Sequence, residues 1–141
     1  MSEKKRVLVV DDEPDFADLV KQYLEQAGFE VEVAYDGVQG LDKVKENPPD
    51  AIVLDVMMPE KDGYEVCGEL KQDEKYSEIP IVLLTAVSTH VGTTQYSHYD
   101  GMSTEADDYL PKPASAEEIT ESVKSLLGVY EGAEGGGGPD P

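Results

Sequence analysis

The chain has 141 residues, enough for one domain with its own hydrophobic core and too few for two domains of ordinary size. Its formal net charge of −20, from 31 acidic against 11 basic residues, disfavours nucleic acid or an anionic membrane as a direct partner and favours divalent cations and basic protein surfaces. The single cysteine, Cys67, excludes a disulfide framework, and no segment resembles a signal peptide or a membrane span, so we expect a cytoplasmic protein.

Apolar runs alternate with helical patterns along the chain, which predicts right-handed βαβ units and a parallel sheet. The first run, residues 7–10, leads directly into the acidic residues 11–13. Pro14 fits the first turn of a helix, and Gly28 ends that helix. The apolar residues between them have the spacing of a buried stripe, and they are Phe16, Leu19, Val20, Tyr23, Leu24 and Ala27.

The second strand and helix repeat this alternation. Residues 31–33 predict an edge strand, because apolar and charged side chains alternate there. Asp36 and Gln39 then resemble the two halves of a capping box at the start of a helix. The side chains that this helix should direct to the core are Val38, Leu41 and Val44.

Two further apolar runs end in polar residues. Residues 51–54 form a run typical of a strand buried on both faces, and this run ends at Asp55. The helix that follows begins at Gly63, and its apolar face holds Tyr64, Cys67 and Leu70. The next run, residues 81–84, ends at Thr85.

A short fifth segment, residues 108–110, leads into Lys112, which stands between two prolines. The final helix carries clear boundary signals, because Ser115 and Glu118 form a capping box and Gly128 supplies a C-terminal stop. Its apolar face holds Ile119, Val123, Leu126 and Leu127.

Two segments do not fit the alternation. Residues 87–107 are rich in Gly, Ser, Thr and Tyr and have no steady apolar stripe, so we expect an extended loop with an irregular or displaced helix. Residues 129–141 include a glycine run followed by proline and should form a disordered tail or linker. The predicted domain therefore spans residues 1–128.

Acidic, hydroxyl and amine side chains stand at the ends of the predicted strands. The carboxyl ends of parallel strands meet at one edge of an open sheet, where such folds place ligands. Carboxylates of Asp11, Asp12 and Asp55 would crowd together there, which is tolerable only with a cation or a proton between them. An oxygen-rich site of this kind suits Mg²⁺. Asp55 is the best candidate nucleophile, because its strand lies between the strands that end at Asp11 and Thr85.

The order of these residues resembles the receiver domain of two-component response regulators. The resemblance covers about residues 5–127, and its motifs in chain order are Asp11-Asp12, Asp55 with Met58-Pro59 and Asp62-Gly63, Thr85-Ala86 and Lys112-Pro113. It implies a flavodoxin-like, doubly wound α/β fold with five parallel strands in the order 2-1-3-4-5.

The resemblance also implies a role for each site residue. Asp55 would attack a phosphohistidine and become an aspartyl phosphate. The ligands of Mg²⁺ would be Asp11, Asp12, Asp55 and the backbone carbonyl of Met57. The groups that hold the phosphoryl oxygens would be the Lys112 amine, the Thr85 hydroxyl and the Ala86 amide. A cis peptide bond before Pro113 would direct Lys112, and Thr85 with Tyr109 would form the conformational switch.

The implied partners are a sensor histidine kinase or a phosphotransfer protein, and a phosphatase that removes the phosphoryl group. The chain would catalyse its own phosphotransfer and dephosphorylation without being an enzyme in the usual sense. It would be a monomer or a weak dimer that depends on phosphorylation.

Other interpretations stay open at this point. Thr85 can be an ordinary strand residue, Lys112 a surface charge and Tyr109 a packing residue. A haloacid-dehalogenase phosphatase would need an Asp-x-Asp motif after the first strand, and a flavodoxin would need a Ser/Thr-rich phosphate loop there. Neither pattern is present. The serious alternative is a protein-interaction module with a receiver-like fold that is never phosphorylated.

Overall fold

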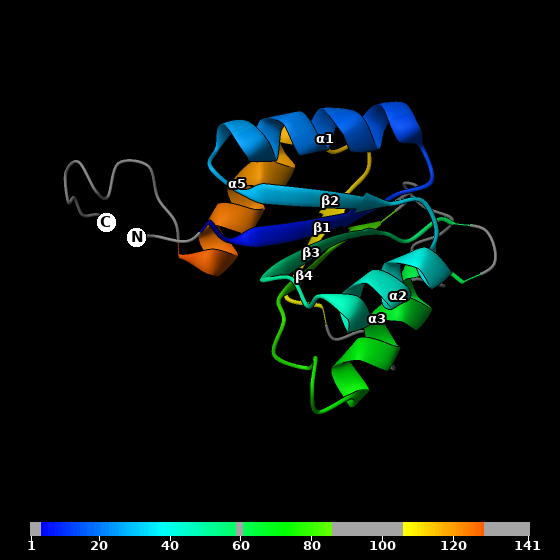
Figure 1. The fold of residues 1–141 in the computed structure, drawn as a ribbon. Coiled ribbons are helices and arrows are strands. Elements are labelled where there is room, and N and C mark those ends of the chain that lie inside the picture. Colours follow the sequence, from blue (N-terminus) through cyan, green and yellow to red (C-terminus); the bar gives the residue numbers. More distant parts are fainter. Residues whose placement is uncertain (1–3, 59–60, 86–105, 129–141) are drawn as a thin grey trace.

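A computed structural model describes residues 4–58, 61–85 and 106–128. In these ranges the strands are β1 (Arg6–Val10), β2 (Glu30–Ala34), β3 (Ala51–Asp55), β4 (Ile81–Thr85) and β5 (Asp108–Pro111). The helices are α1 (Pro14–Gln26), α2 (Gly37–Glu46), α3 (Gly63–Gln72) and α5 (Ala116–Leu127). All strand pairs are parallel, and the strand order is β2-β1-β3-β4-β5. The predicted flavodoxin-like sheet is therefore confirmed (Figure 1).

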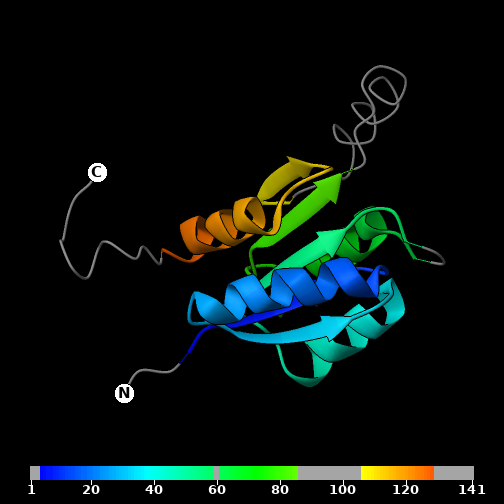
Figure 2. The same ribbon diagram turned by 90° about the horizontal axis from the view of Figure 1, so that it is seen from above.

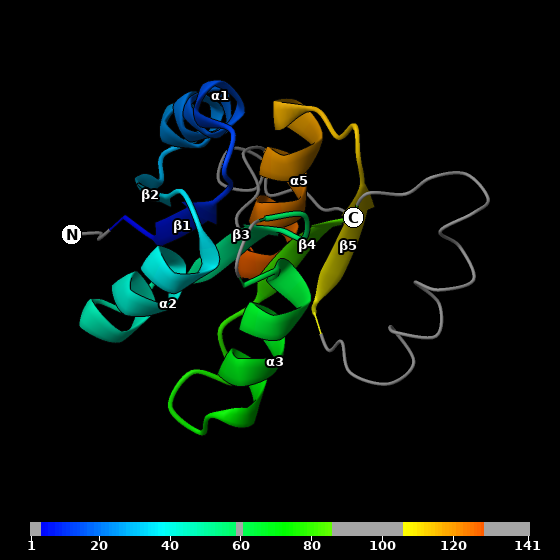
Figure 3. The same cartoon turned by 90° about the vertical axis from the view of Figure 1, so that its right-hand side faces the viewer.

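Helices cover both faces of the sheet. Figure 3 shows α1 and α5 on one side of the strands and α2 and α3 on the other. Seen from above, α1 and α5 lie side by side over the sheet (Figure 2). All but the last two residues of the segment 87–107, where an irregular fourth helix was predicted, and the whole tail predicted for residues 129–141 lie outside the described residues.

Alternate side chains of the buried strands enter two separate hydrophobic cores. Leu8 and Ile52 pack with the apolar residues of α2 and α3, whereas Val9 and Val53 pack with those of α1 and α5. Because both faces of β1 and β3 are covered, neither strand can alternate apolar with polar residues, which explains their continuous apolar runs. Because helices pack on both faces of these strands, the strand ends are held in place.

The stripe predicted for α1 was too wide. Ala17, Val20 and Leu24 are buried, but the side chains of Leu19 and Tyr23 are 44% and 41% exposed. The helix lies on one face of the sheet and contacts α5 along one side, so only a narrow strip of its surface is covered. Leu19 and Tyr23 therefore belong to the outer surface rather than to the core.

Two expectations for α2 were also wrong in detail. Val38 is 45% exposed, and Gly40 faces inward against the side chain of Val10 instead. The amide of Gln39 donates to Asp36 Oδ1 at 2.8 Å, but the Gln39 side chain accepts from the amide of Tyr35 rather than from that of Asp36. The capping box of α2 is thus only half formed. The box of α5 is complete, and its terminal glycine has the expected left-handed backbone.

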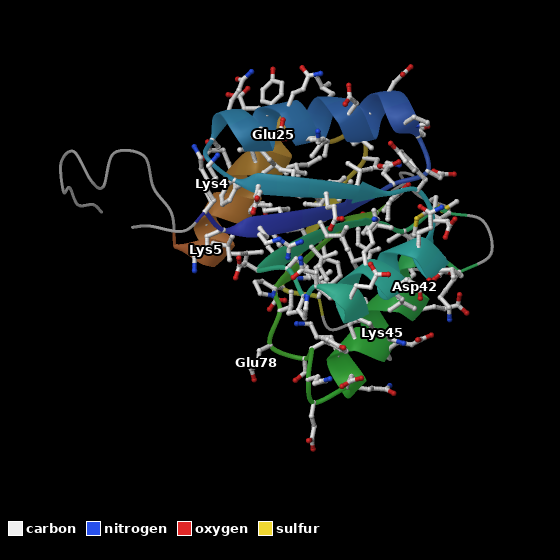
Figure 4. The ribbon with its side chains drawn as sticks, viewed as in Figure 1. Lys4, Lys5, Glu25, Asp42, Lys45 and Glu78 are labelled. Atoms are coloured by element: carbon white, nitrogen blue, oxygen red, sulfur yellow. The ribbon has the colours of Figure 1, made fainter. Side chains whose placement is uncertain are left out.

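The outer surface of the domain carries many charged side chains. Glu25, Asp42, Lys45 and Glu78 point away from the ribbon in Figure 4. Cys67, the single cysteine of the chain, is buried in α3. In the part of the chain that the structure describes, no helix is long and apolar enough to cross a membrane.

Candidate functional site

The polar residues at the strand ends occupy one edge of the sheet. Asp55 is the last residue of β3, and its Cα pairs with that of Leu84 in β4. Asp11 directly follows β1, and its amide donates to the carbonyl of Ala34 at 3.0 Å, which continues the pairing of β1 with β2. Since β3 lies between β1 and β4, the parallel topology brings Asp11 and Asp55 to the same edge.

Three carboxylates form a tight cluster at this edge. Asp11, Asp12 and Asp55 each offer an oxygen, and these oxygens all lie within 4.8 Å of one another. Asp11 and Asp55 are completely buried. The Oδ2 atoms of Asp11 and Asp55 have no hydrogen-bond partner among the described residues. Two buried oxygens that lack donors and stand close together leave room for a cation or a proton.

The other oxygen of each buried carboxylate is hydrogen bonded. Asp11 Oδ1 accepts from the amide of Glu13 at 2.9 Å. Asp55 Oδ1 accepts from the Lys112 amine at 3.0 Å and from the amide of Met57 at 3.3 Å. These contacts fix the orientation of both carboxylates and leave each Oδ2 atom as the oxygen without a donor.

Burial governs the ionisation of the cluster. Burial raises the pKa of Asp11 from 3.8 to about 7, although the Glu13 amide opposes this shift. Burial also raises the pKa of Asp55, against the opposing hydrogen bond from Lys112. For Lys112, burial alone would lower the pKa, but the Asp55 carboxylate outweighs it and raises the pKa. Without a cation, the cluster therefore tends to hold a proton near neutral pH.

Of the remaining predicted residues that the structure describes, Lys112 contacts the cluster through Asp55, and the others lie on β4, on or just after β5, or just after β3. Thr85 ends β4, and its carbonyl accepts a hydrogen bond from the Lys112 amide at 2.7 Å. The peptide bond between Lys112 and Pro113 is cis. Tyr109 of β5 is 37% exposed, and its hydroxyl oxygen accepts from the Ala106 amide at 3.2 Å. Met57 is 52% exposed. Ala86, predicted to contact phosphate through its backbone, lies outside the described residues.

Sequence reasoning missed the contribution of Glu13. Its amide orients Asp11, and its carboxylate lies close enough to Asp11 and Lys112 to influence their ionisation. The signal in the sequence is the third acidic residue of the run 11–13, directly after the two aspartates. A hard divalent cation, bound mainly through carboxylate oxygens, fits this arrangement.

Comparison with known proteins agrees with this geometry. The family model described as "Response regulator receiver domain" matches residues 7–124. A "DNA-binding dual master transcriptional regulator RpaA" from Synechocystis is 41% identical over 122 residues, which are 86% of this chain and 48% of that protein. A "Response regulator MprA" from a Mycobacterium species is 43% identical over 125 residues, which are 86% of this chain and 50% of that protein. The chain thus spans about half the length of these two relatives.

Solved structures show the same fold. The signal receiver domain of a histidine kinase from Syntrophus aciditrophicus has a TM-score of 0.77 and 33% identity, covering 90% of this chain and 93% of that one. The receiver domain of a sensor histidine kinase from Pseudomonas aeruginosa has a TM-score of 0.75 and 25% identity, covering 89% of this chain and 99% of that one. In the second structure a magnesium ion is coordinated in the active site cleft.

Proposed function

Because the chain belongs to the receiver-domain family of response regulators, we propose that Asp55 is its phosphoacceptor and that a histidine kinase or a phosphotransfer protein supplies the phosphoryl group. Phosphorylation of an aspartate with Mg²⁺ is a general property of this family. The observation that carries the assignment to Asp55 is its buried carboxylate, with one oxygen held by Lys112 and the other without a donor.

The proposed transfer uses the free oxygen of Asp55. Oδ2 attacks the phosphorus of a phosphohistidine, a new P–O bond forms, and the P–N bond breaks. The electron pair of that bond stays with the ring nitrogen, which leaves as neutral imidazole when the other nitrogen carries a proton. Lys112 keeps Asp55 Oδ1 oriented before the transfer and places positive charge beside the phosphoryl oxygens during it.

The donor set fits Mg²⁺, because two buried orphan oxygens stand beside a third, accessible carboxylate. Asp11, Asp12, Asp55 and the carbonyl of Met57 would hold the ion. When bound, Mg²⁺ would neutralise charge on the carboxylates and on the phosphoryl oxygens. Asp11 must give up its proton for this, so its raised pKa links metal binding to deprotonation.

The signal would be a change in surface. Thr85 would bond a phosphoryl oxygen, with the Ala86 amide beside it, and Tyr109 would turn from its present, partly exposed position into the space that Thr85 leaves. The hydrogen bond from the Ala106 amide to the Tyr109 hydroxyl stabilises the outward position. Phosphorylation must outweigh this contact.

The proposed partners follow from the same chemistry. The chain catalyses its own phosphotransfer and dephosphorylation, and a phosphatase shortens the signal. One relative is described as DNA-binding, but it is about twice as long, and the net charge of −20 disfavours direct contact between this chain and nucleic acid. A monomer or a weak dimer that depends on phosphorylation remains our proposal.

The test is incubation with Mg²⁺ and a small-molecule phosphodonor, followed by intact-mass measurement. The wild type should gain one phosphoryl group, and Asp55→Asn should gain none. Asp50→Asn is the matched control, because Asp50 precedes the opposite end of β3 and accepts a hydrogen bond from the Arg6 amide at 2.7 Å. Phosphorylation of Asp55→Asn would contradict the assignment, and an unmodified wild type would favour a binding module that is not phosphorylated.

A further inference from the structure

Two Asp-Gly pairs, Asp36-Gly37 and Asp62-Gly63, begin α2 and α3 in the same way. In each pair the aspartate is the N-cap, and its side chain accepts from a backbone amide three residues later, that of Gln39 or of Glu65. The glycine is the first residue of the helix. Neither glycine has the left-handed backbone found at Gly28, so backbone conformation does not explain their presence.

Both bare Cα atoms lie against the segment that connects β3 to α3. A Cβ at Gly63 would lie 2.5 Å from the carbonyl oxygen of Asp55 and 2.8 Å from the Cα of Val56. A Cβ at Gly37 would lie 2.5 Å from the carbonyl oxygen of Lys61. Ordinary contacts begin at 3.4 Å, so a methyl group at either position would displace backbone by roughly 0.9 Å.

This segment is the β3–α3 loop, of which the structure describes residues 56–58 and 61–62, and its first residues carry part of the site. Its ends are joined, because the carbonyl of Val56 accepts from the amide of Gly63 at 3.0 Å. Met57 donates its amide to Asp55 Oδ1, and its carbonyl is the proposed backbone ligand of the metal. Gly63 therefore packs at the Asp55 end of the loop, while Gly37 packs at the far end.

We infer that Gly63 and Gly37 hold the two described ends of the β3–α3 loop in place, and that Gly37 is a positioning residue of the metal site. The inference rests on the proposed function. The inference gives α2 a role at the metal site, although this helix supplies no side chain to the acidic cluster. The start of α2 lies beside α3 (Figures 1 and 3), and a Cβ at Gly37 would also lie 3.0 Å from Val66 of α3. A change at the start of α2 thus reaches Met57 through the backbone of residues 61–63 and the hydrogen bond from the Gly63 amide to the Val56 carbonyl.

The experiment compares two quantities on the full, unphosphorylated chain. Calorimetric titration gives the Kd for Mg²⁺, and urea unfolding without metal gives stability. Gly37→Ala should weaken Mg²⁺ binding about tenfold, the scale seen when groups that orient metal ligands are changed. Gly63→Ala should weaken it at least as much.

Two controls separate positioning from general effects. Gly68→Ala in α3 makes the same substitution where a Cβ would meet nothing within 4 Å, so it reports only the gain in helix propensity. Val44→Ala truncates a buried side chain of α2 and lowers stability away from the loop. Both variants should keep the wild-type Kd for Mg²⁺.

Wild-type Mg²⁺ affinity in Gly37→Ala would overturn the inference, as would an equal loss of affinity in Val44→Ala. Adding Val66→Ala to Gly37→Ala makes room beside α3 but leaves the carbonyl of Lys61 in place, so recovery of binding in this double variant would also overturn it. If Gly37→Ala does not fold, Asp36→Ala removes the N-cap and loosens the start of α2, which should weaken binding roughly threefold. Unchanged binding there would overturn the inference. A wild type that fails to bind Mg²⁺ would overturn the proposed function as well.

Discussion

Asp11→Asn should stabilise the metal-free protein, although it removes a proposed metal ligand. The buried carboxylate of Asp11 has a folded-state pKa of about 7, against 3.8 ordinarily. A raised pKa means that the folded state binds the proton more tightly than the unfolded chain does. Folding is therefore favoured at low pH, and the stability from this group is lost as the pH rises from about 4 to about 7.

The size of this effect follows from the two pKa values. One pKa unit corresponds to about 1.4 kcal/mol, so the shift of Asp11 from 3.8 to about 7 costs the folded state at most roughly 4 kcal/mol near pH 8. Asparagine carries no charge and keeps an oxygen for the Glu13 amide. We expect Asp11→Asn to raise the free energy of unfolding by about 2–4 kcal/mol at pH 8 and to change it little at pH 4.

The assay is urea unfolding at both pH values, in EDTA and in Mg²⁺. In Mg²⁺ the wild type should gain stability, because the ion binds the folded state only, and Asp11→Asn should lose most of that gain. Asp73→Asn is the matched control, since Asp73 also accepts from the amide two residues later, that of Lys75 at 2.9 Å. It should show neither effect. A destabilised Asp11→Asn at pH 8 in EDTA, or a difference that does not depend on pH, would refute the reasoning.

Three further changes test other contacts. Lys112→Met leaves the Asp55 carboxylate without its cation, so the free energy of unfolding should fall by about 1–3 kcal/mol at pH 8. The loss should be smaller at pH 5, where Asp55 is more protonated, and urea unfolding at the two pH values would measure it. Tyr109→Phe removes the acceptor of the Ala106 amide, which should then exchange hydrogen several times faster; an unchanged rate would show that this contact does not hold the segment. Met57→Asn should shorten the life of the aspartyl phosphate, because a carboxamide at this exposed position can orient an attacking water. Mass spectrometry would follow the loss of phosphate, and a rate equal to that of the wild type would show that the side chain at position 57 does not control the water.

The sheet could be predicted from the sequence because its buried strands carry continuous apolar runs that end in polar residues. The same strand ends identified Asp11 and Asp55 as neighbours, since parallel strands share an edge. Helix faces were harder to assign. Spacing alone placed Tyr23 and Val38 inside, but it does not reveal how wide a strip of each helix is covered.

Side-chain partners far apart in the sequence and close backbone contacts could not be predicted. Nothing local indicates that Lys112 reaches Asp55 across 57 residues, or that both buried carboxylates keep an oxygen without a donor. The sequence around Gly37 shows only that a glycine follows an aspartate. The contact that leaves no room for a side chain there is made with a carbonyl group 24 residues further along the chain. The roles assigned to Thr85, Ala86 and Tyr109 stay predictions until phosphorylation is measured.

The outer edge of β2 determines how this domain should behave at high concentration. Among the described strands β2 pairs only with β1, so its other edge offers amide and carbonyl groups to a strand of a second molecule. Glu30 and Glu32 stand on this strand. Although Glu32 forms ion pairs with Arg6 and Lys43, a second copy that paired there would bring carboxylates of the two strands together. At neutral pH this repulsion protects the edge from aggregation. Replacing Glu30 and Glu32 with glutamine removes this protection, and concentrated samples of that variant should begin to associate through β2.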